Sequence, residues 1–85
     1  MRALRHEVFQ TANAYRVAAQ QYCRAARLHE NLEAPTQELL GRSIFYGDAL
    51  RKLRDASTGE VSEDAARRLR ALTTSIHELS RRYRG

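Results

Sequence analysis

Ser43-Ile44-Phe45-Tyr46-Gly47 is the stretch that decides the fold, because it departs from a pattern that the rest of this 85-residue chain follows. Elsewhere, apolar residues recur with the 3.6-residue period of amphipathic helices. At 100° per residue, Tyr46 shares a face with the leucines around it, whereas Ile44 lies about opposite and Phe45 on the flank. One buried face cannot hold all of these side chains. Either a helix here is covered on two sides, which means a partner chain, or the chain turns at this point.

We predict that this stretch lies inside one helix over residues 36–57. Thr36 is a suitable N-cap, and Ser57-Thr58-Gly59 closes the helix, because its glycine suits the left-handed conformation found beyond helix ends. The helix interior contains Gly41 and Gly47, each of which costs about 1 kcal/mol relative to Ala. Both glycines therefore need a packing reason, and we expect a neighbouring backbone to lie close to each.

Two further amphipathic segments flank this helix. Residues 3–33 contain neither Gly nor Pro, and their apolar residues follow the alternating gaps of four and three that define a heptad seam. The seam consists of Val8, Ala12, Tyr15, Ala19, Tyr22, Ala26 and His29. Pro35 ends the first helix, since the residue before a proline is pushed out of the α region. Residues 62–83 form the third helix, with Ser62 as its N-cap.

These helices predict a single all-α domain over residues 1–85, folded as an antiparallel up-down-up three-helix bundle with a long first helix. At 1.5 Å per residue, the first helix spans about 46 Å and each of the others about 33 Å, so that two turns of it overhang. Glutamates at the end of the first helix would then face arginines at the end of the third. This pairing within the chain would explain why the end of the third helix is rich in arginine. The residues concerned are Glu30, Glu33, Arg81, Arg82 and Arg84.

The chain carries a net charge of +5, and fourteen of its fifteen basic residues are Arg. Such a composition favours phosphate-containing partners, among them nucleic acids. Cys23 is the only cysteine, which excludes a disulfide within the chain and favours a reducing compartment. No apolar run approaches the roughly 18 residues of a membrane span, and none resembles a signal peptide. We therefore expect a cytoplasmic protein with no membrane partner.

Residues typical of catalysis or cofactor binding do not form a recognisable pattern. The chain has no Gly-rich phosphate loop, and several of its serines and threonines lie at predicted helix ends rather than in a catalytic pattern with a histidine and an acid. The three histidines lack the spacing of metal ligands, and Cys23 has no second cysteine. We therefore expect no enzyme activity, no metal and no cofactor.

Residues 36–72 resemble in part the helix-turn-helix of the repressor and Cro-like class. By that resemblance, Thr36-Gln37 would open the first helix, residues 44–46 would form the turn and residues 48–54 would be the recognition helix. Ile44 stands where that class has a turn glycine, so we do not assign the chain to it. The resemblance implies an alternative function, a small basic DNA- or RNA-binding regulator. Its candidate contacts are Arg51, Lys52, Arg54, Arg67, Arg68, Arg81 and Arg82.

The favoured interpretation is a non-catalytic protein-interaction module that binds a protein partner, with self-association into a homo-oligomer as the leading form. An exposed apolar group on a small chain usually marks an interface. The expected surface joins apolar residues of the second helix to alanines of the first, which let another backbone approach closely. The predicted partner-binding residues are Leu40, Ile44, Phe45, Ala14, Ala18 and Ala25.

Overall fold

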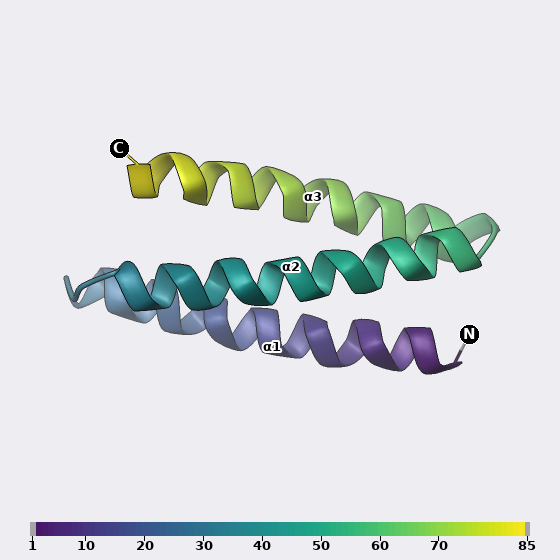
Figure 1. Cartoon of the computed structure of the whole chain (residues 1–85), viewed down its shortest axis with the longest axis horizontal. Helices are drawn as coiled ribbons and strands as arrows, with labels where there is room; N and C mark the ends of the chain where they lie inside the picture. The colour runs from purple at the N-terminus through teal and green to yellow at the C-terminus, as the bar shows by residue number, and fades with distance from the viewer. Residues whose placement is uncertain (1, 85) are drawn as a thin grey trace.

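The computed structural model describes residues 2–84, with side chains described through residue 82. Its helices are α1 (Arg2–Arg27), α2 (Glu33–Ala56) and α3 (Gly59–Arg84), and no strand occurs within residues 2–84. α1 and α3 run in the same direction, and α2 is antiparallel to both (Figure 1). The predicted all-α, antiparallel up-down-up three-helix bundle is confirmed.

α2 is the central helix, and the other two pack against its two sides (Figure 1). The backbones of α1 and α3 stay apart, since no Cα of α1 lies within 8 Å of a Cα of α3 among the described residues. The helix that holds the Ser43–Gly47 stretch is thus covered on two sides by its own chain. The bundle is open between α1 and α3.

The core consists of two apolar clusters spaced along α2. The first cluster contains Val8, Ala49, Leu50, Leu53, Ala65 and Leu72. The second cluster contains Ala18, Leu39 and Leu79. Tyr15 packs against both clusters, and the centroid of its ring lies 5.5 Å from that of Tyr46. This tyrosine pair therefore occupies the middle of the molecule.

α1 ends at Arg27, which is earlier than residue 33, where the sequence predicts its end. The N–H of Glu30 donates to the carbonyl of Ala25 at 2.9 Å, and the N–H of His29 donates to that of Ala26 at 3.2 Å. His29 has a φ of 55°. A left-handed residue with these two hydrogen bonds is a Schellman motif, which ends a helix. Because α1 and α3 each contain 26 residues, the expected overhang of the first helix is absent.

α2 begins at Glu33, ahead of the predicted cap at Thr36. The side-chain Oδ1 of Asn31 accepts a hydrogen bond from the N–H of Glu33 at 2.9 Å. Pro35 lies in the first turn of α2 rather than after the end of α1, and there its missing N–H removes no helical hydrogen bond. Thr36 is buried.

α2 continues without interruption across residues 44–47, which confirms the prediction of one helix through this stretch. The helix-turn-helix-like arrangement of residues 36–72 is wrong, because its turn does not form and residues 48–54 continue the same helix. The physical reason is that α1 and α3 bury residues on two sides of α2, so its apolar residues need not lie on one face.

α3 begins at Gly59, three residues before the predicted start. The φ of Gly59 is 64°, which confirms the left-handed conformation predicted between the second and third helices. Ser62 lies inside α3, and its hydroxyl donates to the carbonyl of Arg54 at 2.9 Å. That carbonyl is one of the last four of α2, which no N–H of its own helix reaches. Ser62 therefore joins two helices instead of capping one.

Candidate interaction surfaces

Two large apolar side chains are exposed on α2, although it is the central helix. Ile44 is 67% exposed and Phe45 is 62% exposed. Beside Phe45, a depression of about 320 Å³ between α1 and α2 is lined by Thr11 and Ala14. An adjoining depression of about 380 Å³ is lined by Ala14 and Val17. We call Ala14, Val17, Ile44 and Phe45 the outer surface.

Three of these four residues were predicted from the sequence. Ile44 and Phe45 are exposed, and Ala14 is half-buried beside Phe45. Val17, which is 52% exposed, was not predicted. Its signal in the sequence is the three-residue spacing from Ala14, which places both residues on one side of a helix.

The other three predicted partner-binding residues lie in the core or at its edge. Leu40 is half-buried and packs against the second core cluster. Ala18 is only 3% exposed and Ala25 only 6% exposed, so their assignment to an exposed surface is corrected. The small side chain of alanine allows two helices to approach closely, and here this close packing occurs within the monomer.

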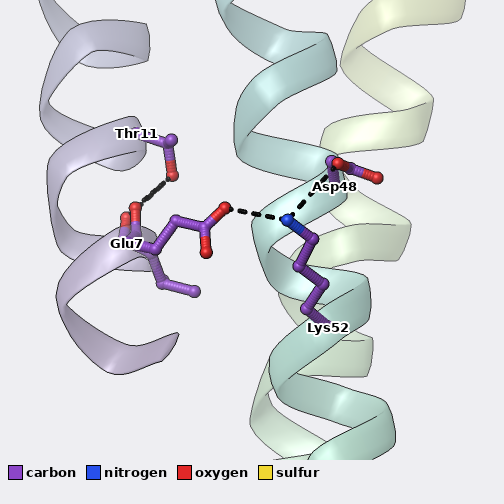
Figure 2. A network of polar contacts seen from close by, with 5 residues as sticks. Glu7, Thr11, Asp48 and Lys52 are labelled. Carbon is purple, nitrogen blue, oxygen red and sulfur yellow. Dashed lines mark hydrogen bonds and ion pairs between the residues drawn. The ribbon is translucent and has the colours of Figure 1, made fainter. Parts of the chain in front are cut away.

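A polar network lies next to the outer surface and joins α1 to α2 (Figure 2). Lys52 Nζ lies 3.2 Å from Glu7 Oε1 of α1 and 3.9 Å from Asp48 Oδ2 of its own helix. The hydroxyl of Thr11 donates to the carbonyl of Glu7 at 2.8 Å. Exposed ion pairs of this kind contribute little to stability, up to about 1 kcal/mol. The network therefore forms a polar border beside the apolar residues.

Four of the seven candidate nucleic-acid contacts are engaged in ion pairs within the chain. Lys52 pairs with Glu7, and Arg54 Nε lies 3.0 Å from Asp55 Oδ1. Arg67 and Arg68 share one carboxylate, at 2.6 Å from Asp64 Oδ1 and 3.0 Å from Asp64 Oδ2 respectively. Within residues 2–82, no ion pair engages the remaining three, which are Arg51, Arg81 and Arg82.

The predicted compensation of the basic end by Glu30 and Glu33 does not occur as ion pairs. No ion pair in the described part of the chain joins either glutamate to Arg81 or Arg82, and the side chain of Arg84 lies outside the described residues. The prediction placed both glutamates on an extended first helix. Glu30 instead lies in the connection after α1, and Glu33 lies in the first turn of α2.

A second candidate surface lies along the opening between α1 and α3. Three cavities of about 680, 250 and 130 Å³ lie there, each lined by residues of α3 and by α1 or α2. The first and second share Arg68, and the second and third share Tyr15 and Ser75. They therefore follow one another along the bundle, and we call the three together the groove.

The groove differs in polarity from one side to the other. Val8 and Tyr15, both members of the predicted heptad seam, line it from α1, while Leu53 and Tyr46 line it from α2. The α3 side carries most of the charged residues. Arg5 faces Glu60 and the neighbouring acids across one end, although no ion pair among the described residues joins them.

Among the described side chains, no group of three or more His, Cys, Asp or Glu residues is arranged to hold a metal ion. No helix within residues 2–84 has a segment both long and apolar enough to cross a membrane. Cys23 is exposed and forms no disulfide.

Comparison of the chain with protein-family models, with curated proteins and with solved structures finds no match.

Proposed function

We propose that the chain is a non-catalytic helical interaction module that self-associates through the outer surface. The observation that carries this proposal is the exposure of Ile44 and Phe45, at 67% and 62%, side by side on the central helix. Neither side chain contributes to the two core clusters. Large apolar side chains exposed at neighbouring positions of a small chain are typical of an interface.

The composition of the surface supports a protein partner. Aromatic side chains are enriched at the centres of interfaces, whereas charged residues form their rims. Phe45 fits the first description, and the Glu7, Asp48 and Lys52 network fits the second. A second copy of the chain presents the same apolar centre, so a two-fold contact would bury both pairs of side chains.

Magnitudes indicate the strength of such a contact. Full burial of a side chain of this size contributes about 1.5–3 kcal/mol, and two residues from each of two copies take part. Association costs about 4–15 kcal/mol in lost translational and rotational freedom. The two quantities are comparable, so we expect an association that depends on protein concentration rather than a permanent dimer.

The test is to replace both residues, Ile44→Glu and Phe45→Glu, in one chain. Because the side chains are exposed in the monomer, we expect unchanged helix content and a melting temperature within a few degrees of wild type. The association constant from sedimentation equilibrium should fall, since burying two unpaired carboxylates per copy is unfavourable.

A matched control is available at Phe9, which is 63% exposed but lies on α1 and lines neither depression of the outer surface. Phe9→Glu adds a carboxylate in place of an equally exposed aromatic ring, and we expect it to leave association unchanged. The proposal fails if the Ile44→Glu, Phe45→Glu chain associates as strongly as wild type.

A further inference from the structure

Six residues on the α3 side of the groove recur at gaps of four and three. They are Asp64, Arg68, Ala71, Ser75, Glu78 and Arg82. This spacing places them along one face of α3 and is the spacing through which nearly aligned helices pack. At 1.5 Å per residue the row is about 27 Å long, which is most of the length of the helix.

The row is self-complementary when a second row runs in the opposite direction. From Asp64 to Arg82 the six residues are acid, base, small, small, acid and base. In the reverse direction, every acid is replaced by a base and every base by an acid, while the two small residues stay in the middle. Antiparallel alignment about position 73 sets Asp64 opposite Arg82, Arg68 opposite Glu78 and Ala71 opposite Ser75, each pair occurring twice. Parallel alignment would set every charge opposite its own copy, which is unfavourable across an interface.

We infer that the groove is a second self-association surface, in which α3 of one copy lies antiparallel to α3 of another. The inference goes beyond the outer surface, because the residues of α2 that line the groove point away from Ile44 and Phe45 at 100° per residue. Each contact in this arrangement is made twice, as a two-fold axis requires. The two small residues allow the helices to approach at the centre, and the charged residues pair toward both ends.

The centre of the row coincides with the centre of the groove. Ala71 and Ser75 line the same cavity as Tyr15 and Tyr46, so the centre of the row lies beside this tyrosine pair. The tyrosines would border the centre of the contact, and Tyr near the centre of an interface is typical of residues that dominate binding energy.

The charged residues of the row are available for a second copy. Within residues 2–82, Glu78 and Arg82 take part in no ion pair. Arg68 shares Asp64 with Arg67, and its side chain is 53% exposed. Its guanidinium has five donors, so that it can retain Asp64 while it binds Glu78 of the second copy.

The test uses charge reversal in a chain that already carries Ile44→Glu and Phe45→Glu, so that the outer surface does not contribute. In that background, Arg68→Glu and Glu78→Arg are prepared as separate chains. Each alone sets two pairs of like charges opposite one another, and the association constant should fall about a hundredfold. A mixture of the two chains restores two pairs of opposite charge, so a heterodimer should form where neither homodimer does.

The matched control is Arg70→Glu, which reverses an exposed charge on the same helix at a residue that does not line the groove. It should leave the association of the background chain unchanged. Circular dichroism verifies that each variant stays helical, since Arg68→Glu also removes the pair with Asp64. A background chain that is monomeric throughout, or a mixture that associates no better than its components, would overturn the inference.

The two proposals can fail separately. If the background chain associates as strongly as wild type and the charge reversals lower its association constant, the result supports the groove and contradicts the outer surface. If wild type associates but the background chain is monomeric, the result supports the outer surface and contradicts the groove.

Discussion

His29 is the residue whose backbone conformation is least suited to its side chain. Its φ of 55° is in the left-handed region, which costs a residue with a Cβ roughly 1–2 kcal/mol. The Schellman hydrogen bonds at the end of α1 require this conformation. Glycine or asparagine is usual at this position, so the sequence contained no clear signal that the helix would end here.

We predict that His29→Gly raises the free energy of unfolding by about 1 kcal/mol, because Gly adopts this conformation without strain. For a chain of this size the melting temperature should rise by about 4–8 °C. His29→Ala is the control and should give no such gain, since it keeps the strained Cβ. Thermal unfolding followed by circular dichroism measures both, and equal melting temperatures for the two variants would contradict the prediction.

Gly41 and Gly47 were expected to lie against a neighbouring backbone, and that expectation is wrong. A Cβ at Gly41 would have no atom within 4 Å, and a Cβ at Gly47 would meet the side chains of Leu72 and Leu69 at 3.5 and 3.7 Å. A Cβ at Gly41 would thus lie in open space, and a Cβ at Gly47 would make ordinary van der Waals contacts. Neither glycine is therefore required by close packing of backbones.

Gly41→Ala should consequently stabilise the protein by about 1 kcal/mol, the difference in helix propensity between the two residues. Chemical denaturation should show a higher midpoint with an unchanged slope, since the surface exposed on unfolding is the same. Gly47→Ala is the comparison at a buried site, and there we expect a gain no larger than at Gly41. A loss of stability at Gly41 would indicate that its surroundings are occupied.

At the scale of the elements, the connection between α1 and α2 shows why helix ends are harder to predict than helices. The sequence contains one proline, Pro35, which suggested that the first helix ends just before it. Proline is equally compatible with the first turn of a helix, where the structure has it. The hydrogen bond from the N–H of Glu33 to Asn31 determines the actual start of α2.

We predict that Asn31→Ala lowers the free energy of unfolding by about 0.5–1.5 kcal/mol, the net contribution of one hydrogen bond. Asn13→Ala is the control, because Asn13 lies inside α1 and its side chain accepts a hydrogen bond only from Arg16. The two variants can be compared by urea denaturation. Equal stabilities would mean that the Asn31 hydrogen bond contributes nothing to α2.

At the scale of the whole molecule, the charges are distributed rather than concentrated in one binding face. The ion pairs of Lys52, Arg54, Arg67 and Arg68 occupy the region that would have been a recognition helix and its neighbour. Arg81 and Arg82, which no ion pair engages within residues 2–82, lie at the other end of the bundle.

We therefore predict weak binding to random duplex DNA, with a shallow dependence on salt. A protein that neutralises six to ten phosphates loses roughly 10³–10⁵ in affinity between 50 and 200 mM salt. Because four of the seven candidate contacts are already engaged in ion pairs within the chain, we expect a loss far below that range in a fluorescence anisotropy titration. A steep slope with tight binding at low salt would favour the nucleic-acid-binding alternative over the proposed interaction module.

The sequence by itself determined the fold class and the continuity of the central helix. Apolar residues at a 3.6-residue period, with few glycines and one proline, favour helices over strands, and this information is local in the chain. The exposure of Ile44 and Phe45 was also visible, because both lie outside the apolar period of their helix.

Only the tertiary structure decided how the helices share the core. Periodicity shows which face of a helix is apolar, but not whether its own chain or another covers that face. Ala18 and Ala25 are buried against α2, whereas Tyr15 of the heptad seam lines an open groove. Which alanines of α1 are buried depends on how α1 is rotated about its axis against α2. That rotation is set by the packing of side chains far apart in the sequence.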